Sequence, residues 1–254
     1  MPKIYAHRGA SAELPENSLP AFARAIERGA YGIELDVHLS RDGVPVVIHD
    51  ETVDRTTRGT GAVADMDLAE LALLDAGNGL RIPTLDDVLN VIGDVVHVDI
   101  EVKAAVAADA VLEATSRRPA LRFAVSSFNH DVLRHVRVKE ADVELWPLTV
   151  GVTDEALGAA AELGSPCLAI HEGFINDDIV KYLHTRGLEA WVWTVNDPDR
   201  AAELTRLGVS GICTDDPERL LSTTVPFQRG VSSGDADGPP EQRVGGRGAS
   251  GTSR

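Results

Sequence analysis

Short apolar runs alternate with amphipathic segments along most of the chain, and this alternation restricts the possible folds more than any other feature of the sequence. The runs begin near residues 3, 31, 96, 122, 143, 167, 189 and 211, and each precedes a segment of helical periodicity or an excursion that contains one. Strands that alternate with helices build parallel sheets, and eight such units in 254 residues are typical of a closed barrel. We therefore predict an α/β fold, a single TIM-type (β/α)8 barrel, with an open doubly wound sheet as the alternative.

Two parts of the chain depart from this alternation. After the second strand, the turn signal Arg-Asp-Gly at residues 41–43 predicts that PVVIH, residues 45–49, returns as an antiparallel hairpin strand. Residues 51–83 lack clean periodicity and are expected to form a short insertion with one helix. Gly, Ser, Pro and charged residues dominate 226–254, which predicts a disordered tail. The predicted domains are a barrel domain at 1–225, which includes the insertion, and this tail.

Charge and hydropathy exclude several classes of partner. The net charge is −16 and the sequence pI is near 4.8, which argues against nucleic acids and anionic membranes as partners. No apolar run approaches the ~18 residues of a membrane span. The start of the chain, MPKIYAHRG, lacks the apolar centre of a signal peptide. We therefore expect a cytoplasmic protein.

Acidic side chains gather on two of the expected strands. Glu34 and Asp36 lie two positions apart in GIELDV, so both share one face of a strand whose other face is apolar. The next barrel strand, HVDIEVK, carries Glu101 and Lys103 on its polar face in the same way. Neighbouring parallel strands end at one rim, so we expect Glu34, Asp36 and Glu101 to meet and bind a divalent cation. Oxygen ligands suit Mg²⁺ or Ca²⁺, and Mn²⁺ as well.

Cations and histidines accompany these acids at the expected strand ends. Arg8 follows the first strand and Lys103 follows the third, and an arginine fork with a lysine beside a metal is suited to holding a phosphate. His7 and His49 lie at the same rim, where imidazoles supply an acid and a base near neutral pH. The set predicts metal-assisted cleavage of a small-molecule phosphodiester.

The motifs that carry these residues resemble those of the glycerophosphodiester phosphodiesterase family. The resemblance rests on HRGASAELPENS, GIELDV, PVVIHDETVDRTT, the Glu-Val-Lys at 101–103 and WTVN, and it extends from residue 3 to about residue 221. It implies a barrel with a small insertion after the second strand. It also implies metal ligands at Glu34, Asp36 and Glu101. The acid/base pair falls on His7 and His49, and the phosphate-binding cations on Arg8 and Lys103.

The resemblance implies hydrolysis of glycerophosphodiesters to sn-glycerol 3-phosphate and a free alcohol. His7 is assigned as the base and His49 as the acid, with the exchange of the two left open. The nucleophile is either water or the substrate's own glycerol hydroxyl. One alternative is a lysophospholipase D-like activity, for which the aromatic content of 4% gives no sign of an apolar channel. Another is a non-catalytic binder of phosphorylated polyols, which a missing histidine or carboxylate would indicate; none is missing.

A few further residues have two interpretations. Trp193 is a candidate contact for the glycerol part of the substrate, with core packing as the alternative. Asn17 or Ser18 is expected to cap the following helix, a role that would account for Asn17, and His38 is expected to face solvent. His97 and Asp99 are expected to form a structural polar pair deeper in the barrel.

Overall fold

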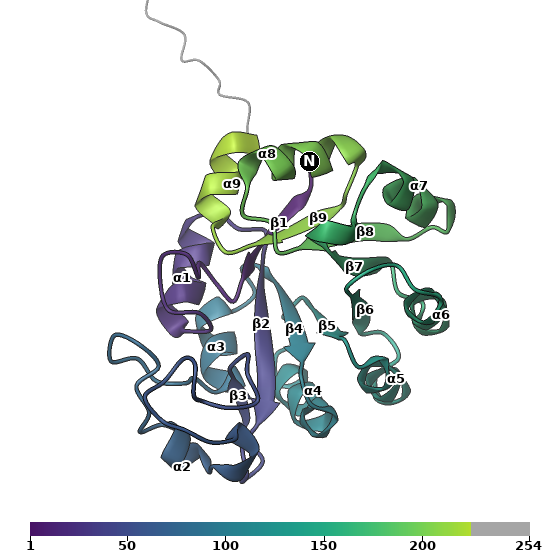
Figure 1. The fold of residues 1–254 in the computed structure, drawn as a ribbon. Coiled ribbons are helices and arrows are strands. Elements are labelled where there is room, and N and C mark those ends of the chain that lie inside the picture. Colours follow the sequence, from purple (N-terminus) through teal and green to yellow (C-terminus); the bar gives the residue numbers. More distant parts are fainter. Residues whose placement is uncertain (225–254) are drawn as a thin grey trace, which may run out of the picture.

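The computed structural model describes residues 1–224 as a barrel of eight parallel strands (Figure 1). The predicted tail at 226–254 lies outside these residues. Around the barrel the strands follow the order β1, β9, β8, β7, β6, β5, β4, β2, and the pairing of β2 with β1 closes the ring. The strands are Lys3–His7 (β1), Gly32–Leu39 (β2), His97–Val102 (β4), Phe123–Ser127 (β5), Glu144–Thr149 (β6), Cys167–His171 (β7), Glu189–Trp193 (β8) and Gly211–Thr214 (β9). The closed barrel is confirmed, and the open sheet is excluded.

Helices surround this ring and return the chain from one strand to the next (Figure 1). Ser18, Thr84, Thr153 and Asn176 each accept a backbone N–H at a helix start, which is the role expected of such side chains. The helices are Leu19–Glu27 (α1), Leu85–Ile92 (α3), Ala108–Ser116 (α4), His130–Lys139 (α5), Asp154–Leu163 (α6), Asp177–Thr185 (α7), Pro198–Leu207 (α8) and Pro217–Thr224 (α9). None of the described helices is long and apolar enough to cross a membrane.

The insertion follows the hairpin as expected. Strand β3 (Pro45–Val47) pairs antiparallel with β2, and the segment after it contains the short 3₁₀ turn Val63–Asp65 and the helix α2 (Leu68–Leu71). The insertion and β3 share a small apolar cluster that includes Val46, Val53 and Leu71. The insertion therefore packs as a satellite beside β2 and β3, outside the barrel (Figure 1).

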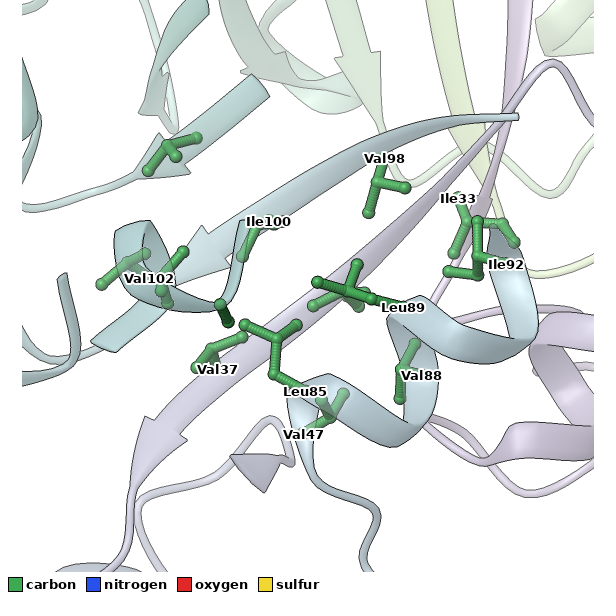
Figure 2. Close-up of a cluster of buried hydrophobic side chains, with 14 of the residues drawn as sticks. Ile33, Val37, Val47, Leu85, Val88, Leu89, Ile92, Val98, Ile100 and Val102 are labelled. Atoms are coloured by element: carbon green, nitrogen blue, oxygen red, sulfur yellow. The ribbon is translucent and has the colours of Figure 1, made fainter. Parts of the chain in front are cut away.

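The largest apolar core lies between the barrel and its helices. Figure 2 shows α3 packed on β2 and β4, with Leu85 and Leu89 between the two elements. The apolar parity of each strand supplies this layer, since Ile33 and Ile100 are fully buried there. The opposite parity of β2 and β4, which holds the acidic side chains, must then point into the barrel.

An aromatic cluster fills the barrel interior below the acids. Tyr5, Trp146 and Trp191 pack with ring centroids 4.4–5.7 Å apart. Room for these rings depends on a missing side chain, because a Cβ at Gly211 would lie 2.1 Å from the indole of Trp191. The cluster occupies this part of the barrel and forms the floor of the cavity that the polar residues line.

The Gly211→Ala variant is expected to lower the free energy of unfolding by about 1–3 kcal/mol, because the buried indole of Trp191 must shift away from the added methyl group. The control is Gly158→Ala in α6, where nothing lies within 4 Å of the added Cβ. Alanine there should raise stability by about 0.5–1 kcal/mol, since glycine is unfavourable within a helix. Urea unfolding measures both. Equal effects in the two variants would contradict the packing argument.

Candidate active site

Three carboxylates meet at the mouth of the barrel. Strands β2 and β4 pair in register, with Asp36 opposite Glu101, so Glu34 and Asp36 lie beside Glu101. One oxygen atom from each of the three groups lies within 4.8 Å of the others, and all three side chains are buried. The sequence predicted this cluster correctly.

The electrostatics of the cluster are those of crowded buried acids. Burial, and then repulsion from Asp36 and Glu101, raises the pKa of Glu34 well above its ordinary value. Burial and Asp36 also raise the pKa of Glu101. Burial opposes ionisation of Asp36 too, but Lys103 and Arg8 outweigh it and lower its pKa to about 2. The site therefore holds more negative charge than its own side chains stabilise.

The two predicted phosphate-binding cations lie against these acids. Lys103 Nζ is 2.6 Å from Glu101 Oε1 and 3.0 Å from Asp36 Oδ1. Arg8 Nε is 3.3 Å from Asp36 Oδ2, and the backbone N–H of Arg8 donates to Glu34 Oε2 at 2.9 Å. Arg8 has a φ of 57°, and Gly9 next to it has a φ of 82°. A Cβ at Gly9 would lie 2.7 Å from the backbone of Ala21 in α1, so glycine is required for this turn.

His7 is held by an acidic residue from the last strand end. Its Nδ1 lies 2.7 Å from Asp215 Oδ1, and its Nε2 is 4.0 Å from Glu34 Oε2. The pKa of Asp215 is lowered to about 2, because His7, Asn196 and Ser11 outweigh its burial. An ionised carboxylate only accepts hydrogen bonds, so Nδ1 of His7 carries a proton and Nε2 is left to exchange one.

His49 has the same arrangement at the end of the hairpin. Its Nδ1 lies 2.6 Å from Asp50 Oδ1, so Nε2 is again the atom left for proton exchange. Burial, together with the charges of Lys103 and Arg8, lowers the pKa of His49 against the opposing effect of Asp36 and Asp50. His49 and His7 line the same cavity at the barrel mouth, so the two predicted histidines do share one rim.

Arg55 of the insertion connects the two sides of the site. Its guanidinium donates to Asp50 Oδ2 at 2.7 Å and to both oxygens of Glu16 at 2.8 Å. Asp50 orients His49, and Glu16 accepts a hydrogen bond from Arg8 Nη1 at 2.9 Å. Arg55 thus acts through Asp50 and Glu16 on a histidine and an arginine that line the cavity.

The Arg55→Gln variant is therefore expected to lower kcat/KM by about tenfold or more and to shift the pH profile, since Asp50 loses the partner that fixes it against His49. Arg55→Lys should recover little, because an ammonium cannot bind two carboxylates in this fork geometry. Arg41→Gln is the matched control: Arg41 is similarly exposed and bridges Asp67 and Glu70 away from the cavity. A pH profile that is unchanged in Arg55→Gln would contradict a positioning role.

The structure corrects three expectations about single residues. Of the two candidate caps, Ser18 caps α1. Asn17 does not serve the helix start: it is buried with a φ of 55° and donates to Asp36 Oδ2 at 2.8 Å. His38 does not face solvent: it is 6% exposed, and its Nε2 lies 3.1 Å from the carbonyl oxygen of His49. His97 does lie deeper, but its Nδ1 bonds the hydroxyl of Tyr5 at 2.8 Å and not Asp99.

Trp193 on β8 lines the same cavity as the charged residues, which stand at the ends of β1, β2 and β4. Phe128, Leu148 and Trp191, from the end of β5, from β6 and from β8, line it as well. One half of the cavity is thus ionic and the other apolar, an arrangement that orients a substrate with a charged and an uncharged part.

The carboxylate cluster fits a divalent cation. Hard ions such as Mg²⁺ and Ca²⁺ prefer several carboxylate oxygens, and Glu34, Asp36 and Glu101 supply them from two rigid strands. The three carboxylates and a bound phosphodiester carry four negative charges, and Arg8 and Lys103 carry two positive ones. One divalent ion neutralises the two negative charges that remain. Oxygen ligands alone do not select among Mg²⁺, Ca²⁺ and Mn²⁺.

Fold and site together define a class: hydrolases that act on phosphoric diesters from the mouth of a parallel barrel. The chain belongs to the glycerophosphoryl diester phosphodiesterase family, because a sequence model of that family matches residues 7–219.

Individual relatives agree with this assignment. The chain is 38% identical to a glycerophosphodiester phosphodiesterase of Caldanaerobacter subterraneus subsp. tengcongensis over 235 residues, which cover 86% of this chain and 96% of that one. Its fold is similar to that of an Oleispira antarctica phosphodiesterase solved in complex with the product sn-glycerol-3-phosphate, with a TM-score of 0.84, 28% identity, and coverage of 88% and 96%. A glycerophosphodiester phosphodiesterase from Thermotoga maritima matches with a TM-score of 0.74, 31% identity, and coverage of 87% and 98%.

Proposed function

We propose that the protein catalyses the metal-dependent hydrolysis of glycerophosphodiesters to sn-glycerol 3-phosphate and an alcohol. One observation carries this proposal: the carboxylate cluster, Arg8, Lys103 and two carboxylate-bound imidazoles converge on a single cavity. The product bound in the similar Oleispira antarctica phosphodiesterase supports the same product here. The barrel domain, residues 1–225, is proposed as the unit that carries the activity, in the cytoplasm.

The substrate phosphate is assigned to the ionic half of the cavity. The Arg8 guanidinium and the Lys103 ammonium supply its direct ion pairs, because both lie at the edge of the carboxylate cluster. Glu34, Asp36 and Glu101 are proposed to hold one divalent ion, Mg²⁺ or Ca²⁺, with Mn²⁺ as a further candidate. When bound, such an ion neutralises phosphate charge and favours attack at phosphorus.

Proton transfer is assigned to the Nε2 atoms of the two histidines. Burial lowers the pKa of His49 and so favours its neutral form, which is the form that a base needs, and we assign the base to His49. His7, whose Nδ1 is held by Asp215, then donates a proton to the departing alkoxide. This reverses the roles first assigned from the sequence. The attacking group is water or the glycerol hydroxyl of the substrate.

The test is a panel of glycerophosphodiesters with choline, ethanolamine or glycerol as the alcohol, each incubated with and without EDTA. We expect release of sn-glycerol 3-phosphate that EDTA abolishes and that added Mg²⁺, Ca²⁺ or Mn²⁺ restores. Mass spectrometry of the early products distinguishes the nucleophiles, because a cyclic glycerol phosphate forms only when the glycerol hydroxyl attacks. Tight binding of the diesters without turnover would favour the non-catalytic binder instead.

A further inference from the structure

Several buried polar atoms around the cavity have no hydrogen-bond partner. Among the described residues there are seven such side-chain atoms, and two of them, Arg8 Nε and Asp36 Oδ1, lie in ion pairs of the carboxylate cluster. Three others belong to residues that line the cavity: Asp99 Oδ1, Ser126 Oγ and Trp193 Nε1. A buried polar atom without a partner costs free energy unless a ligand or a water molecule pairs with it.

Two of these residues, Asp99 and Ser126, are neighbours below the carboxylate cluster. Asp99 precedes Glu101 by two positions on β4, so it lies about 7 Å deeper along the strand. Ser126 on β5 is paired in register with Glu101. Burial raises the pKa of Asp99 to about 8, and the Ser126 hydroxyl beside it opposes this rise. The two side chains are therefore close, yet their geometry leaves both Asp99 Oδ1 and Ser126 Oγ without a partner.

Asp99 also differs from the acids above it in having no cation as partner. Lys103 pairs with Asp36 and Glu101, and Arg8 pairs with Asp36, but no ion pair reaches Asp99 within residues 1–224. A carboxyl and a hydroxyl side by side suit a neutral hydroxyl group, which can donate one hydrogen bond and accept another. The quaternary ammonium of choline can do neither, so it would leave both groups unpaired.

We propose that Asp99 and Ser126 bind the C1 hydroxyl of the substrate's glycerol, so that preferred substrates are diesters in which this hydroxyl is free. The inference rests on the proposed function and names the residues by which the site recognises glycerol. The C2 hydroxyl neighbours the phosphate and is a candidate nucleophile, so it stays near phosphorus. The C1 hydroxyl is at the far end of the three-carbon chain, which leads from a phosphate at the carboxylate cluster down to Asp99.

The shape of the cavity favours glycerol over the leaving alcohol at this depth. Tyr5, Trp146 and Trp191 form the floor, so only a group of small and constant size fits beneath the carboxylate cluster. Glycerol is common to all the proposed substrates, whereas the alcohol varies in size and suits the mouth of the barrel. The rings also supply apolar surface for the glycerol carbons, and the two polar side chains orient the hydroxyl.

The test measures kcat/KM for choline release from three diesters with the full-length, metal-loaded protein. They are glycerophosphocholine, its 1-deoxy analogue, and its 1-O-methyl ether, which keeps the C1 oxygen but not its proton. We expect kcat/KM to be at least ~10-fold lower with either analogue, because each leaves the buried Asp99 acceptor unpaired. All three diesters share choline and the C2 hydroxyl, so the contacts of those groups cancel in the ratio.

Variants connect this preference to the two residues. Ser126→Ala should reduce the ratio of glycerophosphocholine to the 1-deoxy analogue by about threefold or more, with little loss on the analogue. Asp99→Ala should reduce it as well, and any effect on the neighbouring metal ligands is common to both substrates. Asp99→Asn should keep most of the preference, since its amide oxygen still accepts a hydrogen bond.

Ser127→Ala is the matched control. Ser127 follows Ser126 on β5 but faces the other side, where its hydroxyl donates to the carbonyl oxygen of Val102 at 2.8 Å. The variant should leave the substrate ratio unchanged and melt at a lower temperature than the parent, because it loses a complete hydrogen bond. Without substrate, Ser126→Ala should melt no lower than the parent, because its hydroxyl has no partner to lose.

Each other outcome has a defined meaning. Hydrolysis of all three diesters with equal kcat/KM overturns the C1 subsite and leaves the proposed function intact. A preference above tenfold that neither Ser126→Ala nor Asp99→Ala lowers also overturns it, because the hydroxyl is then bound elsewhere and a water molecule pairs with these two side chains. If none of the diesters is hydrolysed, the proposed function fails and this inference fails with it.

Discussion

Replacing His49 by alanine is expected to lower kcat for glycerophosphocholine by at least about 10²-fold, and replacing His7 should have an effect of similar size. The reason is that each imidazole offers one free Nε2 to the cavity while an aspartate holds its Nδ1. The variants should nevertheless differ when the leaving group changes. The 4-nitrophenyl diester of glycerol phosphate expels a phenolate that needs no proton, so His7→Ala should lose little activity on it, whereas His49→Ala should lose activity on both substrates.

The pH dependence gives a second measurement of the same assignment. A base acts when it is deprotonated, and the pKa of His49 lies below the ordinary 6.5, so activity should rise with pH along a limb centred below 6.5. His49→Ala should lose this limb. His135→Ala is a control, because His135 lies on α5 and pairs with Asp109, outside the cavity. The opposite leaving-group pattern, with His49→Ala rescued and His7→Ala not, would return the base to His7.

The parts of the site that the sequence predicted are those that strand periodicity determines. Alternation along β2 and β4 places Glu34, Asp36 and Glu101 on inward faces, and closure of eight units brings those faces together. Asp215 was predictable by the same logic. In a closed barrel the last strand pairs with the first, so the residue after β9 must lie near the end of β1, where His7 stands.

Other contacts depend on irregular backbone, for which the sequence carries no periodic signal. Arg55 meets Glu16 across 39 positions of chain, from the irregular stretch between β3 and the 3₁₀ turn Val63–Asp65 to the loop before α1. Asn17 looked like an ordinary helix cap, and only its left-handed backbone turns the amide towards Asp36. His38 was expected to face solvent, but the hairpin folds the chain back over it and buries it beneath the backbone of His49.

Removal of the divalent ion should have the largest effect on the reaction. EDTA is expected to lower turnover by about 10³-fold or more, because the ion supplies several kcal/mol of charge stabilisation that Arg8 and Lys103 cannot replace. Glu34→Gln should reproduce this loss in the presence of metal, since it removes one ligand charge while Gln still accepts the hydrogen bond from the Arg8 backbone. Glu162→Gln is the control, because the exposed Glu162 of α6 pairs with Arg134 of α5, outside the cavity.

Glu34→Gln should lower activity but raise the stability of the metal-free protein. The combination distinguishes a metal site from an acidic cluster that binds no ion. A carboxyl whose pKa is raised on folding favours the folded state at low pH and loses that contribution as pH rises through its folded pKa. At pH 7 in EDTA, Glu34→Gln should therefore unfold at a higher temperature than the parent, by a margin equivalent to about 1–2 kcal/mol. Saturating metal should stabilise the parent by several kcal/mol and the variant much less, so the order of the two melting temperatures reverses. If metal shifts neither melting temperature, the carboxylates do not bind a divalent ion, and the metal-dependent mechanism is wrong.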